Sequence, residues 1–275
     1  MQHRYSLAHL TAMALPPVDL IEVAARTGYD YVGLRLSRVT PQEPLYPLIT
    51  NRVAMKATKD KLAATGVKVW DIELARMDPS RDAQHFFPML DATAELGAQH
   101  VICQLPDPDR ERAHDRFSTL CDYAKPLGIT VNLEFPWWTE TGNLETASAA
   151  LNAVKRSNAA ILIDMLHFRR SNSSTQALKQ LPRAWFHFAH LCDGPAASPT
   201  DMDAILHEAR SCRWFPGAGD FGVTDILECL PQDITYALEI PGDELTAQIG
   251  FEEYARRALQ AAKRHLDTAS ARQAA

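Results

Sequence analysis

Residues 159–167 read AAILIDMLH, an apolar run that ends in an aspartate, Asp164. Three other apolar runs in the second half of the chain end in an ionisable side chain: TVNLEF at Glu134, FHFAHLCD at His190 and YALEIPG at Glu239. Uninterrupted apolar runs are typical of parallel strands whose two faces are both buried. The pattern therefore predicts a parallel sheet covered by helices.

The four strand-end residues also predict a metal site. A carboxylate or imidazole that closes a buried strand is costly unless it is paired or bound to a metal. In chain order the four are Glu134, Asp164, His190 and Glu239. Three carboxylates and one imidazole suit Mg²⁺ or Mn²⁺, with Co²⁺ or Zn²⁺ as further possibilities. We predict one divalent ion held by these four residues.

The rest of the chain repeats the alternation of a short apolar run and an amphipathic stretch. There are eight such units, and the first four helix-like stretches end before Gly28, Gly66, Gly97 and Gly128, as a left-handed helix cap prefers. A (β/α)8 barrel takes about 250 residues, and this chain has 275. The prediction is an α/β protein with a single (β/α)8 barrel over residues 1–266 and a flexible, small and polar tail over 267–275.

Composition restricts the partners and the location. The net charge of −6 counts against binding to nucleic acid. The five cysteines form no CxxC pair, which is typical of a reducing cytoplasm. No stretch approaches the roughly 18 apolar residues of a membrane span. We expect a cytoplasmic protein that acts on a small molecule, without a membrane or nucleic-acid partner.

Active sites of (β/α)8 barrels lie at the carboxyl ends of the strands. Polar residues near the other predicted strand ends are His9, Arg35, Glu73, Gln104, His167 and Asp193. Each has a simpler interpretation: a lone glutamate caps a helix or joins an ion pair, Arg35 and Glu73 pair with each other, and Asp193 forms a turn before Gly194. The long segment 192–223 is expected to lie over the mouth of the barrel.

The predicted ion leaves open coordination positions for substrate oxygens. It would then act as a Lewis acid while a proton leaves the carbon next to a metal-bound carbonyl, giving an enediolate. Glu134 and Glu239 come from strands on opposite sides of the site, so they are candidates for the proton acceptor and donor.

At these residues the chain resembles the xylose isomerase-like TIM-barrel superfamily, in particular its sugar phosphate isomerase/epimerase branch of ketose 3-epimerases, hydroxypyruvate isomerase and inosose dehydratase. The motifs that carry the resemblance are NLEF around Glu134, LIDMLHFRRS around Asp164, HFAHLCD around His190, PGAGDFG at 216–222 and ALEIPG around Glu239. They span most of the second half of the chain.

The resemblance implies that Glu134, Asp164, His190 and Glu239 hold the ion, and that the two glutamates are the catalytic acid and base. It implies that His167 contacts substrate oxygens and that Arg210 faces a substrate oxygen or carboxylate, with Arg213 as a rival. Trp138, with Trp137, is expected to wall the pocket, and Glu73, Arg35 and His9 are further candidates for substrate binding. Members of the branch often form homodimers or homotetramers.

The leading hypothesis is a divalent-metal-dependent isomerase or epimerase acting on a sugar or another polyhydroxy carbonyl compound. A dehydratase or lyase that uses the same enolate chemistry is the alternative. An endonuclease IV-like phosphodiesterase needs three zinc ions, and His9, Glu73 and Asp193 would supply only part of the extra ligand set. A barrel without activity that binds a ligand is a fourth hypothesis. The short, acidic PGAGDFG loop argues against a phosphorylated substrate.

Overall fold

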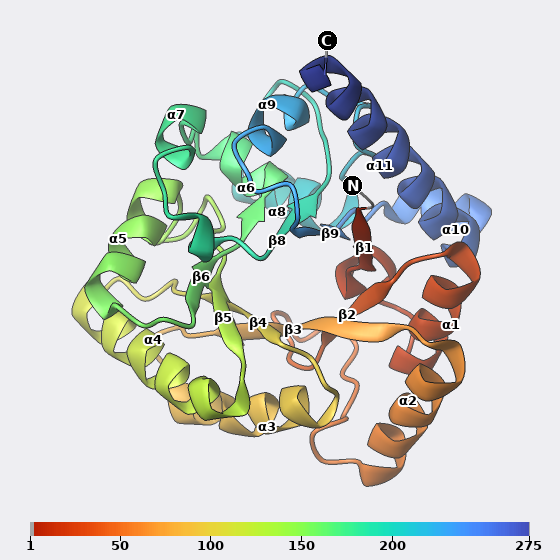
Figure 1. The fold of residues 1–275 in the computed structure, drawn as a ribbon. Helices are drawn as coiled ribbons and strands as arrows, with labels where there is room; N and C mark the ends of the chain where they lie inside the picture. Colours follow the sequence, from red (N-terminus) through yellow and green to blue (C-terminus); the bar gives the residue numbers. More distant parts are fainter. Residues whose placement is uncertain (1–2, 275) are drawn as a thin grey trace.

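The strands form one parallel sheet that curls into a barrel, seen along its axis in Figure 1. The computed structural model describes residues 3–274. In chain order the strands are β1 (Arg4–Leu7), β2 (Tyr31–Arg35), β3 (Lys68–Arg76), β4 (His100–Gln104), β5 (Thr130–Leu133), β6 (Ala159–Ile161), β7 (Ile163–Asp164), β8 (Phe188–Leu191) and β9 (Thr235–Leu238). Their order in the sheet is β6-β5-β4-β3-β2-β1-β9-β8-β7.

The two edge strands of this order close the barrel, because only Leu162 separates β6 from β7. Strand β6 pairs with β5, and β7 pairs with β8. The backbone N–H of Leu162 donates to the carbonyl of Leu133 at 3.0 Å, so the pairing continues through the break. The β6 and β7 segments are thus two halves of one strand, and the predicted (β/α)8 barrel is confirmed.

The helices lie outside the strands (Figure 1). They are α1 (Pro17–Thr27), α2 (Arg52–Thr65), α3 (Phe87–Glu95), α4 (Arg110–Ala124), α5 (Leu144–Val154), α6 (Met165–Arg170), α7 (Thr175–Leu178), α8 (Met202–Ser211), α9 (Val223–Leu227), α10 (Asp243–Ile249) and α11 (Phe251–Ala274). Short 3₁₀ turns cover His9–Ala12, Ala83–Phe86, Lys125–Leu127 and Arg183–Trp185. None of the described helices combines the length and the apolar character that crossing a membrane would require.

Helix α2 shows how the local sequence sets the helix ends. The side chain of Asn51 accepts hydrogen bonds from the backbone N–H groups of Val53 and Ala54, and Gly66 ends the helix with φ +76°. Residues 267–274, which the sequence assigns to a tail, continue α11 as far as Ala274. Residue 275 lies outside the described residues.

The interior of the barrel is filled by apolar side chains from several strands. Leu74, Ile102, Leu162, Phe188 and Ala237 form one buried cluster. A much larger cluster packs the outer face of the sheet against the helices. The centroids of the Phe188 and His190 rings are 5.8 Å apart. The inner cluster therefore forms an apolar floor beneath the residues at the carboxyl ends of the strands.

Candidate metal centre

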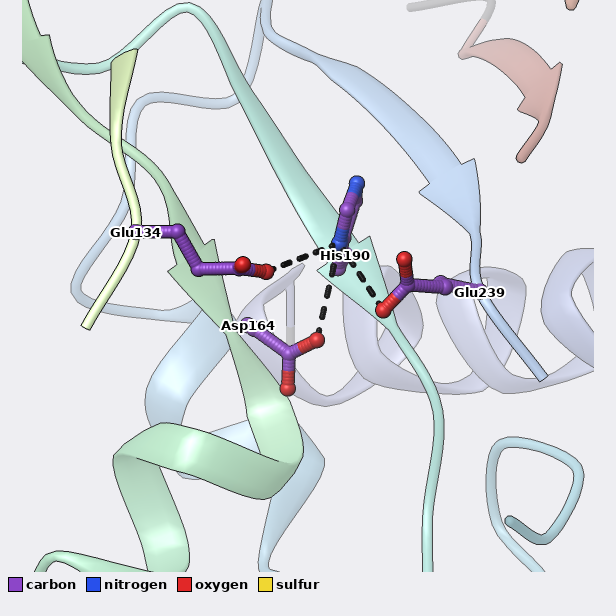
Figure 2. A group of neighbouring side chains, drawn as sticks. All are labelled: Glu134, Asp164, His190 and Glu239. Carbon is purple, nitrogen blue, oxygen red and sulfur yellow. Dashed lines mark ion pairs between the residues drawn. The ribbon is translucent and has the colours of Figure 1, made fainter. Parts of the chain in front are cut away.

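The structure brings the four strand-end residues into one buried group (Figure 2). Glu134 follows β5, Asp164 ends β7, His190 lies in β8 and Glu239 follows β9. Each offers a ligand atom, and all four atoms lie within 4.8 Å of one another. The Nδ1 atom of His190 is 3.5 Å from Glu134 Oε1, 3.5 Å from Asp164 Oδ2 and 3.2 Å from Glu239 Oε2.

The chemistry of this group fits a divalent cation. Within residues 3–274, neither ring nitrogen of His190 has a partner at hydrogen-bonding geometry, although three carboxylates surround Nδ1. Buried polar atoms are rarely left without partners. Three carboxylate oxygens and one imidazole nitrogen converging on one point are a ligand set that Mg²⁺, Mn²⁺ or Zn²⁺ accepts. The residues present therefore fit the metal that the sequence predicts.

The carboxylates hold His190 in its protonated form when no ion is bound. Burial alone lowers the pKa of His190, but the charge of Glu239 and the contacts with Asp164 and Glu134 outweigh burial and raise it well above the usual value. The imidazolium then supplies the positive charge that the three carboxylates need. Because a ligating histidine must be neutral, binding of a cation here would release a proton.

Arg213 is the second cation of this group. Its Nη1 donates to Asp164 Oδ2 at 2.6 Å, and its Nη2 lies 2.9 Å from Glu239 Oε2. Its Nε donates to the carbonyl of Ala209 at 2.9 Å. Burial raises the pKa of Asp164, but the charges of Arg213 and then His167 outweigh burial and hold it well below the usual range. Of the two rival arginines, Arg213 is thus the one that contacts the predicted ligands.

A hydrogen-bonded chain orients the carboxylate of Glu134. Gln104 Nε2 donates to Glu134 Oε2 at 2.5 Å, and Arg76 Nη1 donates to Gln104 Oε1 at 2.7 Å. Gln104 was among the polar strand-end residues of the sequence analysis, whereas Arg76 was not. Because Gln104 occupies Oε2, the other oxygen, Oε1, is the one that faces His190.

The pocket above the four residues contains most of the predicted substrate-binding side chains. Its lining includes Arg35, Glu73, Trp138, His167 and Arg210. Arg35 and Glu73 also pair with each other, as the simpler interpretation predicts, because Arg35 Nε donates to Glu73 Oε2 at 2.8 Å. Arg35 Nη1 also lies 3.4 Å from Glu43 Oε2. These charges therefore neutralise one another on one side of the pocket.

The structure does not place His9 in this pocket. Its Nδ1 accepts a hydrogen bond from the backbone N–H of Arg35 at 2.9 Å, and its Nε2 lies 2.9 Å from the carbonyl of Leu15. The ring also stacks on Tyr46, and burial lowers its pKa to about 4. Both ring nitrogens of His9 contact backbone groups, so the prediction that His9 binds substrate is corrected. His9 instead connects the segment after β1 to the end of β2.

Trp138 and His167 form one wall of the pocket. Their ring centroids are 5.1 Å apart at an interplanar angle of 76°. Burial lowers the pKa of His167, and the charges of Asp164 and Glu134 oppose this shift without reversing it. Trp137 does not line the pocket and packs against the main core. The expected aromatic wall therefore consists of Trp138 with His167.

Asp193 does more than form a turn. Its Oδ1 accepts the backbone N–H groups of Gly194 at 2.9 Å and Phe221 at 3.0 Å, and its Oδ2 accepts those of Gly217 at 3.0 Å and Gly219 at 3.1 Å. A Cβ atom on Gly219 would lie 2.3 Å from the carbonyl oxygen of Gly194. The PGAGDFG loop therefore folds around this carboxylate, and the backbone of Asp193 also pairs with that of Trp214, the residue after Arg213.

Asp71 is a buried carboxylate that the sequence analysis missed. Within the described part of the chain, neither of its oxygens has a hydrogen-bond partner. Burial, and after it the charge of Glu73, raise its pKa to about 8. Residues two apart in a strand point to the same face, so the position of Asp71 two residues before Glu73 was the signal that could have revealed it.

The family model described as "Xylose isomerase-like TIM barrel" matches residues 21–267, which is most of the chain. The protein belongs to this family. The resemblance seen in the strand-end motifs is thus confirmed at the level of the family. The buried group of four residues lies at the carboxyl ends of the strands, which is where active sites of this fold are found.

Three similar proteins are informative. "Inosose isomerase" of Bacillus subtilis (strain 168) is 23% identical over 274 residues, which cover 89% of each chain. The crystal structure of the IolI protein "with a binding zinc atom" has a TM-score of 0.74 at 20% identity and covers 97% of each chain. D-allulose 3-epimerase from Methylomonas sp., in complex with D-allulose, has a TM-score of 0.71 at 17% identity over 96% of this chain and 97% of its own. The two structural matches establish a shared fold.

Proposed function

We propose that the protein is a divalent-metal-dependent isomerase or epimerase of a sugar or another polyhydroxy carbonyl compound. The observation that carries the proposal is the pair Glu134 and Glu239, which meet in one buried group with Asp164 and His190. The names of the similar proteins, an inosose isomerase and an allulose epimerase, point to the same class of reaction.

Glu134, Asp164, His190 and Glu239 would hold the ion. When bound, the ion supplies a Lewis acid that orients the substrate and stabilises negative charge on its carbonyl oxygen. The zinc atom named for the IolI structure supports a bound metal in a barrel of this fold. The ion proposed first is Mn²⁺ or Mg²⁺, with Co²⁺ or Zn²⁺ as alternatives.

The two glutamates would move the proton. Glu134 follows β5 and Glu239 follows β9, with the joined strand β6 and β7 and then β8 between them in the barrel, so the two carboxylates would approach a bound substrate from different sides. One accepts the proton from the carbon next to the carbonyl, and the other donates a proton to the neighbouring carbon, or to the opposite face of the same carbon. Gln104 holds one oxygen of Glu134 in place, and burial keeps bulk water from the transfer.

The test is incorporation of solvent deuterium into a panel of ketoses, keto acids and cyclic polyols by the metal-loaded protein. We expect Glu134→Gln and Glu239→Gln each to slow the exchange by about 10²-fold or more, because general acid–base catalysis contributes about 10²–10⁴. Glu95→Gln, at the surface beside Arg52, is the matched control and should exchange at the wild-type rate. Near-normal exchange in either active-site variant would refute the acid–base assignment.

A dehydratase or lyase would begin with the same proton abstraction and would use the same residues. The mass of the product separates the two reactions. Isomerisation or epimerisation leaves the mass of the substrate unchanged, apart from the deuterium taken up. Loss of water or of a larger group would replace the isomerase assignment by the lyase one.

A further inference from the structure

Two arginines at the mouth of the pocket differ from the other two that line it. Arg35 and Arg213 form ion pairs with carboxylates. The side chain of Arg76 donates only to the amide oxygen of Gln104, and the side chain of Arg210, which also lines the pocket, makes no hydrogen bond or ion pair with another described residue. Arg76 and Arg210 therefore bring positive charge to the pocket without an opposite charge from the protein in contact.

The surroundings make this arrangement unfavourable in the absence of a ligand. Both side chains are half-buried, and burial lowers the pKa of each, with the positive charge of Arg210 lowering that of Arg76 further. Like charges that share a partly desolvated pocket repel each other more strongly than in water.

The acidic groups that act on the two arginines do not remove the imbalance. The charges of Asp78 and Glu134 raise the pKa of Arg76, but Asp78 accepts the backbone N–H of Ser80 and pairs with Arg81, and Glu134 accepts a hydrogen bond from Gln104.

The charge of Glu43 raises the pKa of Arg210, but the Oε2 atom of Glu43 accepts the backbone N–H of Val39 at 2.9 Å and lies 3.4 Å from Arg35 Nη1. The Glu43 carboxylate therefore already has two partners, Val39 and Arg35. Within the described residues no carboxylate forms an ion pair with Arg76 or Arg210, so the pocket has room for an anionic group from a ligand beside them.

We propose that Arg76 and Arg210 bind an anionic group at one end of the substrate, so that the substrate is an acidic polyhydroxy carbonyl compound rather than a neutral sugar. This inference rests on the proposed function. The guanidinium fork is suited to bidentate binding of a carboxylate or a phosphate.

The hydrogen-bonded chain from Arg76 through Gln104 to Glu134, with links of 2.7 Å and 2.5 Å, ties the anion site to a catalytic carboxylate. Binding of the anion at Arg76 would therefore place the reacting carbon relative to Glu134. In this arrangement Arg76 and Arg210 determine specificity, whereas the two glutamates move the proton.

Binding is tested with three compounds that share one carbon chain and lack the carbonyl at which reaction occurs. These are sorbitol, gluconate, which carries a carboxylate, and sorbitol 6-phosphate, each titrated calorimetrically into the metal-loaded protein. We expect one of the two anions to bind at least about tenfold more tightly than sorbitol, since hydrogen bonds to charged groups are the stronger ones. The anion that gains more identifies the group as a carboxylate or a phosphate.

Variants show whether the arginines are responsible. Arg210→Gln and Arg76→Gln should each reduce the preference for the anion about tenfold, and Arg210→Lys should keep part of it. Arg183→Gln, which removes an exposed arginine paired with Asp233, should leave the preference unchanged. An equal affinity for all three compounds, or an anion preference that persists in Arg210→Gln because the anion binds the metal, would overturn the proposal.

The deuterium-exchange assay separates this inference from the proposed function. A neutral ketose and its terminal carboxylate or phosphate derivative are compared as substrates of the wild-type protein. Equal kcat/KM for the neutral and acidic members would leave the isomerase assignment intact and refute the anion site. Exchange with neither member would count against the isomerase assignment, while the binding titration would still decide whether Arg76 and Arg210 hold an anion.

Discussion

At the scale of single residues, two positively charged side chains of the candidate site contact the same two carboxylates. His190 and Arg213 both contact Asp164 Oδ2 and Glu239 Oε2. His190 can lose its proton and become a ligand, whereas an arginine stays charged under all physiological conditions. Arg213 therefore remains a fixed counter-charge, and the exchangeable positive charge of the site is the proton of His190 or the ion that replaces it.

Removing Arg213 should damage both stability and activity. Arg213→Met leaves Asp164 without its shortest ion pair, and breaking one partner of a buried pair costs about 3–5 kcal/mol. We expect a fall of that size in the free energy of unfolding, measured by denaturant titration, together with a loss of exchange activity. Arg213→Lys should recover part of the stability because it keeps a positive charge. A wild-type unfolding curve for Arg213→Met would show that the ion pair is unimportant.

Asp71 predicts a pH-dependent difference in stability. An acid whose folded pKa is raised to about 8, against about 3.9 when unfolded, stays protonated in the native state. Folding then takes up a proton, and stability is lost as the pH rises from about 4 to about 8. Asp71→Asn has no such cost, so its advantage over the wild type should grow by up to about 3 kcal/mol between pH 5.5 and 8.5.

The measurement is the free energy of unfolding of the chelator-treated, metal-free protein at the two pH values. Asp60→Asn is the control, because Asp60 is exposed and its ion pair with Lys56 lies on the surface. A constant difference between Asp71→Asn and wild type at both pH values would show that Asp71 is ionised throughout.

The sequence alone predicts the site residues that end strands, but not those whose position depends on packing. Glu134, Asp164, His190 and Glu239 stand out because each interrupts or closes an apolar run. Arg76 was missed because an arginine at a strand end is ordinary on a surface, and only the fold turns it toward Gln104. His9 was misassigned because its contacts with the backbone of Leu15 and Arg35 cannot be read from spacing.

At the scale of elements, short apolar runs limited the prediction. Helix α6 (Met165–Arg170) directly follows β7, and its first residues, Met165 and Leu166, continue the apolar run of the strand. A run of this length does not distinguish a helix from a strand by its periodicity. The side chain of Asp164 resolves the ambiguity in the structure, since its Oδ1 accepts the backbone N–H of His167 at 3.1 Å and begins the helix.

The loop around Asp193 gives a prediction at this scale. Asp193→Ala removes the acceptor of four backbone N–H groups, so we expect a loss of about 2–3 kcal/mol in the free energy of unfolding and faster proteolysis within residues 216–222. Asp201→Ala is the matched control in the same connection, because it removes a single helix-cap bond to Ala204, worth about 1 kcal/mol. Equal effects of the two substitutions would show that Asp193 is no more than a turn residue.

At the scale of the whole molecule, the (β/α)8 barrel was predictable because its eight units repeat the same alternation of a buried strand and a helix. The break between β6 and β7 was not, since Leu162 lies within a continuous apolar run and only hydrogen bonding divides it. Closure of the barrel brings residues more than 100 positions apart, such as Glu134 and Glu239, into one buried group.

Metal content measured after dialysis tests the central claim most directly. The wild-type protein, loaded with Mn²⁺ or Zn²⁺ and dialysed, should retain about one ion per chain. His190→Ala should retain far less, while His187→Ala, three residues earlier and beside the cavity at the other end of the barrel, should match the wild type. A full equivalent of metal in His190→Ala, or none in the wild type under loading conditions, would contradict a metal centre formed by Glu134, Asp164, His190 and Glu239.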